Sequence, residues 1–85
     1  MVLKALVADD DPLMRALVSV SLISSAEIVE AADGNEALAM IRQHEFDVLL
    51  LDWDMPGKTG IELARYVRAS DSHVPILMVT AKAER

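Results

Sequence analysis

Carboxylates follow two separate apolar runs of this 85-residue chain. Asp9 and Asp10 come directly after the run 3–8, and Asp52 comes directly after Val48–Leu51. Three carboxylates within a few ångströms of one another repel, so the pKa of at least one rises unless a cation lies among them. The chain has no cysteine, and oxygen ligands without sulfur or imidazole favour a hard ion such as Mg²⁺. The spacing therefore predicts a magnesium site, if the fold brings the two runs together.

Such a site suits phosphoryl transfer. A carboxylate can act as the nucleophile, the metal neutralises charge on the phosphoryl oxygens, and a hydroxyl or ammonium donor holds another oxygen. Thr80 follows a third apolar run, Ile76–Val79, and would add a hydroxyl at the same edge. A single acid after a strand more often caps a turn. Acids after two buried runs are what favour a site.

Short strands that alternate with helices would position these groups. Val48–Leu51 lacks the alternation of a half-exposed strand and fits a central strand buried on both faces. The predicted strands are 3–8, 26–31, 47–51 and 76–79, and the predicted helices are 12–24, 34–43 and 60–69. The connections have room only for helical crossovers, which make the sheet parallel. The predicted fold class is α/β, with the order β-α-β-α-β-α-β and ligands at the carboxyl ends of the strands.

Capping residues mark the start of each predicted helix. Asp11 is placed as an N-cap with Pro12 at the first helical position. Asp33 and Thr59 each precede a glutamate by three residues, which is a capping pattern. Local propensity conflicts with the first helix, because the segment 18–24 alternates with period two and favours a strand; the cap and the preceding strand decide for a helix. Its apolar residues along one face are Leu13, Leu17 and Val20, with Met14, Val18 and Leu22 nearby.

Composition limits the classes of protein to which the chain can belong. With 53% hydrophobic and 26% charged residues, it has the make-up of one globular domain. The net charge of -6 argues against a nucleic-acid surface, because no basic run is present to neutralise phosphates. No apolar run approaches the ~18 residues of a membrane helix, and no signal-peptide pattern follows Met1. We expect a single cytoplasmic domain over residues 1–85 that binds neither nucleic acid nor membrane.

The chain resembles the receiver domain of two-component response regulators over nearly all of its length. The motifs that carry the resemblance are ALVADDDPLMRALV, EIVEAADGNEALAMI, FDVLLLDWDMPGKTGIELARYVR and VPILMVTAKAER. The resemblance implies a flavodoxin-like sheet with the strand order 2-1-3-4. It also implies phosphorylation by a histidine kinase, in a domain that assists its own phosphorylation and dephosphorylation but is no enzyme toward other substrates.

The resemblance assigns a role to each acid. Asp52 would be the phosphoacceptor and a Mg²⁺ ligand, and Asp10 a direct ligand. Asp9 would act largely through a metal-bound water, and Asp54 through its backbone carbonyl.

Other roles in the resemblance fall on uncharged residues. Thr80 would hydrogen-bond a phosphoryl oxygen and move on phosphorylation, beside the backbone N–H of Ala81. Gly60 would begin the third helix, and the preceding loop would be shaped by Met55, Pro56 and Gly57.

The sequence departs from the family where it stops. Receiver domains continue through a further helix, strand and helix, or roughly 35 residues of typical element length. The family's phosphoryl-neutralising lysine on the fifth strand has no counterpart, since neither Lys58 nor Lys82 matches its motif. We expect Mg²⁺ binding to survive and phosphorylation to be impaired. We also expect an uncovered sheet face and a free edge strand, and hence a homodimer.

Two alternatives remain open at this point. The D-x-D of Asp52 and Asp54 also opens haloacid-dehalogenase-type phosphatases, although Met55 and Pro56 stand where that family expects a threonine. The other is a non-enzymatic one: a truncated or engineered receiver fragment that acts only as a folding or self-association module. Trp53, the only tryptophan, adjoins the acceptor and would either report on the site or pack in the loop.

Overall fold

A computed structural model of the chain describes residues 2–79. Its elements are β1 (Leu3–Ala8), α1 (Pro12–Leu22), β2 (Ala26–Ala31), α2 (Gly34–Gln43), β3 (Val48–Leu51), α3 (Gly60–Ala69) and β4 (Ile76–Met78). The predicted elements are all present, and four of them have the predicted bounds. The first helix ends at Leu22 rather than 24, because the chain turns there and Ser25 N–H donates to the Leu22 carbonyl (2.9 Å). The third and fourth strands are each one residue shorter than predicted.

The strands form one parallel sheet in the order β2-β1-β3-β4, which confirms the predicted topology. The two central strands are β1 and β3. In the register of the sheet, Ala8 at the end of β1 lies opposite Ala31 of β2 on one side and Leu51 of β3 on the other. Leu51 in turn lies opposite Met78 of β4. The residues that follow these strands therefore emerge at one edge of the sheet.

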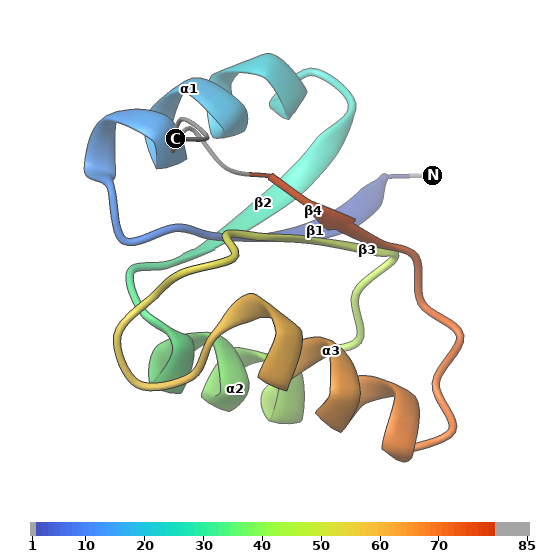
Figure 1. Ribbon diagram of the computed structural model, residues 1–85. Coiled ribbons are helices and arrows are strands. Elements are labelled where there is room, and N and C mark those ends of the chain that lie inside the picture. The colour runs from blue at the N-terminus through green and yellow to red at the C-terminus, as the bar shows by residue number, and fades with distance from the viewer. Residues whose placement is uncertain (1, 80–85) are drawn as a thin grey trace.

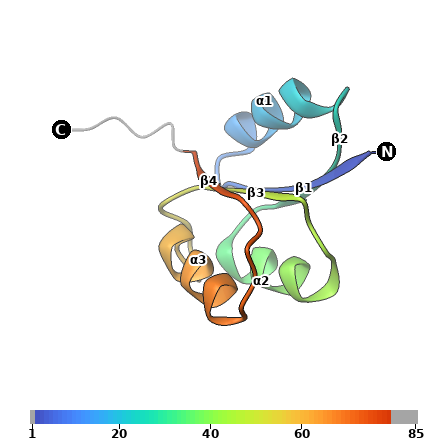
Figure 2. The ribbon, with the colours of Figure 1, turned by 90° about the vertical axis from the view of Figure 1, so that its right-hand side faces the viewer.

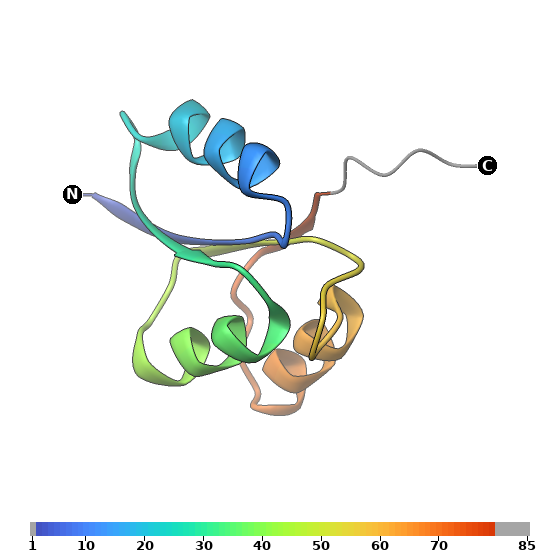
Figure 3. The same ribbon diagram turned by 90° about the vertical axis from the view of Figure 1, so that its left-hand side faces the viewer.

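Helices cover the sheet unequally on its two faces. Helices α2 and α3 lie together on one face, and α1 lies on the other (Figure 1). Views from the two sides show the three layers, with α1 above the sheet and the other helices below it (Figures 2 and 3). None of the described helices is long and apolar enough to cross a bilayer.

Alternate residues of the central strands build a core on each face of the sheet. Leu6 and Leu49 belong to the larger cluster, under α2 and α3, together with Leu63 and Val67 of α3. The smaller cluster, on the α1 side, consists of Ala5, Val7 and Leu50, with partly buried Val18, Leu22, Ala26, Ile28, Val48 and Val79 packed against it. Burial on both faces is what the unbroken aliphatic runs predicted.

The face of α1 that packs on the sheet differs from the apolar face that the sequence predicted. Its Asp11 cap is present, since the Asp11 carboxylate accepts from Leu13 N–H (2.9 Å). Val18 and Leu22 pack inward with Ser19, which is buried. The predicted apolar face instead lies exposed: Leu13 is 68%, Leu17 54% and Val20 70% accessible.

Candidate metal and phosphoacceptor site

Backbone pairing at the ends of β1 and β3 places Asp9 and Asp52 beside each other. Asp9 N–H donates to the Ala31 carbonyl (3.1 Å), and Asp52 N–H donates to the Ala8 carbonyl (2.9 Å). These bonds continue the strand ladders by one residue on each strand. The two acids are therefore fixed by the sheet rather than by a loop, although they are 43 positions apart in the chain.

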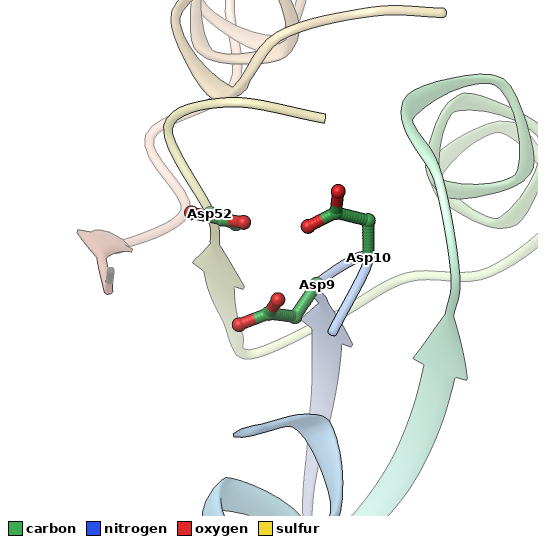
Figure 4. Close-up of side chains that lie close together, drawn as sticks. All are labelled: Asp9, Asp10 and Asp52. Atoms are coloured by element: carbon green, nitrogen blue, oxygen red, sulfur yellow. The ribbon is translucent and has the colours of Figure 1, made fainter. Parts of the chain in front are cut away.

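Three carboxylates meet at this edge of the sheet. Asp9, Asp10 and Asp52 each offer an oxygen, and these oxygens lie within 4.8 Å of one another. The side chains turn toward a common space between the strand ends (Figure 4). Asp9 and Asp52 are buried, with exposures of 5% and 2%, whereas Asp10 is exposed. We call these residues the acidic triad, and its oxygen-only donor set fits a hard divalent ion such as Mg²⁺.

The electrostatics of the triad favour a bound cation. Burial raises the pKa of the Asp9 carboxyl above its ordinary value, and the neighbouring Asp52 and Asp10 carboxylates raise it further. The hydrogen bond from Asp11 N–H to Asp9 Oδ1 (2.9 Å) acts in the opposite direction. A divalent ion among the three would remove the repulsion and hold all of them ionised.

The loop between β3 and α3 is held against the start of α2. Gly34 N–H donates to the Pro56 carbonyl (2.9 Å). A Cβ on Gly34 would lie 1.9 Å from the Lys58 carbonyl oxygen, so only glycine permits this approach. Gly57 sits in the left-handed region at φ +84°, with the Asn35 side chain against it. The loop that follows Asp52 is thereby fixed on the helix.

A second close contact fixes the other end of this loop. Gly60 N–H donates to the Trp53 carbonyl (3.1 Å), and a Cβ on Gly60 would lie 2.3 Å from the Asp52 carbonyl oxygen. Met55 is buried under the loop, whereas Trp53 is 55% exposed. The expected start of α3 at Gly60 is confirmed, and its reason is the narrow gap beside Asp52.

The remaining predicted site residues divide into two groups. Asp54 lies in the loop with an exposed side chain outside the acidic triad, and the contribution of its backbone carbonyl to a metal stays a prediction. Thr80 and Ala81 lie outside the described residues, so their roles also stay predictions. The strand that leads to them is in place, because Val79 N–H donates to the Leu51 carbonyl (2.9 Å) beside Asp52.

Neither histidine lies at the triad. His44 and His73 line an open cavity of about 620 Å³ at the opposite edge of the sheet, near the starts of β3 and β4. His44 Nδ1 lies 2.9 Å from the Lys4 ammonium nitrogen.

Comparison with known proteins identifies the family. Residues 5–85 match the response regulator receiver domain. The chain belongs to this family. The chemotaxis protein CheY of Pseudomonas aeruginosa is 45% identical over 87 residues, which cover 98% of this chain and 70% of that protein. Receiver domains of response regulators are phosphorylated by histidine kinases and bind Mg²⁺ in an acidic site.

Solved structures give the same result for the fold. The chemotaxis response regulator CheY4 of Vibrio cholerae superposes with a TM-score of 0.87 at 38% identity, over 99% of this chain and 72% of that one. The response regulator TrrA of Thermotoga maritima, in complex with Mg²⁺-BeF, gives a TM-score of 0.87 at 34% identity, over 98% and 72%. Over residues 2–79 the chain thus has the flavodoxin-like receiver fold, with four parallel strands and three helices. The family match also excludes the dehalogenase-type interpretation of the D-x-D motif.

Proposed function

We propose that Asp52 is the phosphoacceptor of this receiver domain and that the acidic triad binds one Mg²⁺ ion for the reaction. The observation that carries the proposal is the meeting of three carboxylates from two strand ends within 4.8 Å. Asp10, which is exposed, would bind the ion directly. Asp9 would act largely through a metal-bound water and Asp54 through its carbonyl oxygen.

The transfer itself needs little from the protein beyond alignment. A carboxylate oxygen of Asp52 attacks phosphorus, and the bond from phosphorus to the donor's histidine nitrogen breaks, with its electron pair left on that nitrogen. Asp52 is held for an in-line approach by its backbone bond to Ala8 and by the close contact with Gly60. When bound, Mg²⁺ supplies positive charge against the phosphoryl oxygens.

Phosphorylation of this 85-residue chain on its own should be slow. The ammonium donor that receiver domains carry on a fifth strand is not among these residues. Loss of one such donor commonly costs about 10²–10³ in rate. We propose that the chain acts only on its own acceptor and on no separate substrate. Its place would be the cytoplasm, where a chain without cysteine suits the reducing conditions.

The test is the intact mass of the chain after incubation with Mg²⁺ and acetyl phosphate as a small phosphodonor. We expect slow, Mg²⁺-dependent addition of one phosphoryl group, and none in Asp52→Asn. Asp54→Asn is the matched control and should be phosphorylated like the wild type, because its proposed contact uses only the backbone. Phosphorylation that persists in Asp52→Asn, or that needs no divalent ion, would overturn the assignment.

A second candidate function is self-association without phosphotransfer. The observation that favours it is the set of exposed apolar side chains on one side of the molecule, on the outer face of α1 and on the edge strand β4: Leu13, Leu17, Val20 and Leu77. We propose that two copies of the 85-residue chain pair through this surface or through the free edge of β4. A tight dimer that takes up no phosphoryl group would favour this function over the first.

A further inference from the structure

The side chain of Arg15 contacts the backbone of the acidic triad, and the sequence motifs assign no role to this residue. Arg15 lies in the first turn of α1. Its Nη1 donates to the Asp9 carbonyl oxygen (2.8 Å), and its Nε donates to Oε1 of Glu30 on β2 (2.9 Å). The Arg15 side chain is only 20% exposed, against 46% for Glu30. The guanidinium thus joins α1, β2 and the end of β1.

These contacts complete a three-way restraint on Asp9. Its N–H donates to the Ala31 carbonyl (3.1 Å), its carboxylate accepts from Asp11 N–H (2.9 Å), and its carbonyl accepts from Arg15. A peptide unit is planar, so a fixed carbonyl also fixes the nitrogen and Cα of the next residue. The next residue is Asp10. The direction in which the Asp10 side chain leaves the backbone therefore depends on the bond from Arg15.

We propose that Arg15, oriented by Glu30, is a positioning residue for the acidic triad. It holds the Asp9–Asp10 peptide so that both carboxylates present oxygens to the ion that Asp52 also faces. The proposal rests on the proposed function and extends it to a residue outside the metal-binding set. Arg15 is expected to touch neither the ion nor the phosphoryl group.

Two effects of removing Arg15 have opposite signs. Loss of a positive charge near three carboxylates would strengthen cation binding, but the guanidinium faces the Asp9 carbonyl rather than a carboxylate of the triad, and its side chain is still 20% exposed to water and salt. Loss of the bond to the Asp9 carbonyl frees the peptide to rotate and weakens cation binding. Outer-shell partners of this kind are commonly worth ~10–100-fold in metal affinity. The positioning effect should therefore be the larger one, so that removal of Arg15 weakens Mg²⁺ binding. The loss of charge alone would strengthen it.

The first readout is Mg²⁺ affinity, followed by the fluorescence of Trp53 in the full 85-residue chain. We expect Arg15→Met to weaken Mg²⁺ binding by ~10-fold or more. Arg42→Met removes the same charge from α2, where Arg42 Nε donates to the Tyr66 hydroxyl (3.3 Å), and should change the affinity less than about twofold. Arg15→Lys, which can reach one of the two acceptors but not both, should restore part of the loss.

The second readout needs no metal. Hydrogen exchange of the Asp11 amide, measured by NMR in the absence of Mg²⁺, reports whether the Asp9 carboxylate stays in place. We expect faster exchange in Arg15→Met, with the amides of Leu6 and Leu49 in the sheet unchanged. General acceleration of exchange across those sheet amides would mean a merely structural role and would overturn the proposal.

The two readouts separate this inference from the proposed function. A wild-type chain that binds no Mg²⁺ would overturn the metal assignment, while the exchange of the Asp11 amide would still decide the role of Arg15. Unchanged exchange there in Arg15→Met, or Mg²⁺ affinity equal to or tighter than in the wild type, would overturn the positioning role.

Discussion

At the scale of single residues, the fold places the carboxylate of Asp9 where its negative charge is unfavourable. Its carboxyl is buried beside two other acids, and both burial and like charge raise its pKa. A group with a folded pKa above its unfolded value contributes stability that is complete below the unfolded pKa. That contribution is lost as the pH rises through the folded pKa. The metal-free protein at neutral pH therefore carries an unfavourable charge that serves cation binding.

Asp9→Asn should raise the free energy of unfolding of the metal-free chain at neutral pH. The amide removes the charge, and its oxygen can still accept the hydrogen bond from Asp11 N–H. The same change should reduce stabilisation by Mg²⁺, which for a wild-type chain at a hundred times its Kd is about 2.7 kcal/mol. Urea unfolding with and without Mg²⁺ measures both effects. A variant less stable than the wild type without metal would contradict this assignment of charge.

Mg²⁺ affinity should fall as the pH is lowered through the raised pKa of Asp9, because protonation of Asp9 removes negative charge from the site that the ion occupies. A fluorescence titration of Trp53 at several pH values measures this. Mg²⁺ affinity that does not change with pH in the acid range would argue against Asp9 as part of the site.

Glu62 affects the pH dependence of stability in the opposite sense from Asp9. The hydrogen bond from Thr59 N–H lowers the Glu62 pKa, so the stability that Glu62 contributes is lost as the pH falls.

At the scale of elements, the sequence predicted the helices and strands better than the contacts between them. Aliphatic runs and caps predicted all seven elements, because strands buried on both faces and N-caps leave local patterns. The roles of Arg15 and Gly34 were missed, because they depend on partners far along the chain, Glu30 and the loop residue Lys58. A glycine directly after the Asp33 cap was the only local sign. The inward face of α1 was also not predictable from apolar spacing, since the helix is apolar on both sides.

Gly34→Ala should loosen the loop that follows Asp52. The new Cβ meets the backbone of Lys58, which cannot move aside as a flexible side chain can. Overpacking of this kind commonly costs about 1–3 kcal/mol. We expect a loss of that order in urea unfolding, together with weaker Mg²⁺ binding. Unchanged stability would mean that the loop is not held on α2 in solution.

Ser19→Ala should stabilise the chain. Ser19 is buried in α1, and its Oγ has no hydrogen-bond partner within residues 2–79. An unmade bond of a buried hydroxyl costs about 1–3 kcal/mol, and alanine is the better helix former. Ser21→Ala is the control, because Ser21 is exposed and its Oγ donates to the Leu17 carbonyl (2.9 Å). A loss of stability in Ser19→Ala larger than in the control would show that the Ser19 hydroxyl is satisfied in solution.

At the scale of the whole molecule, the two sides of the sheet differ. Two helices cover one side, and α1 packs mainly over β1 and β2 on the other. The central strand β3 is nevertheless covered on that side, since Leu50 is only 8% exposed. On the α1 side of the sheet, the exposed apolar groups include Leu77 on β4 and the outer face of α1. An uncovered sheet face was expected from the helix count; that face is exposed at Leu77 of β4 but covered at Leu50 of β3.

Self-association should depend on that side of the molecule. We expect a dimer by light scattering at micromolar concentration, and a monomer for Leu17→Glu, because a charge would be placed in the apolar contact. Ile61→Glu is the control: Ile61 is 47% exposed on α3, against 54% for Leu17, and α3 covers the other face. A well-folded wild-type monomer at this concentration would refute the dimer.

The most direct test of the whole account is a Mg²⁺ titration of the wild type beside Asp10→Asn and Asp52→Asn, followed by Trp53 fluorescence. The two acids follow different strands, β1 and β3, and meet only if the sheet pairs these strands as described. The wild type should show one saturable transition. Each variant should weaken it by ~10-fold or more, since even outer-shell partners commonly cost that much. Equal affinity in Asp52→Asn and the wild type would contradict a shared ion.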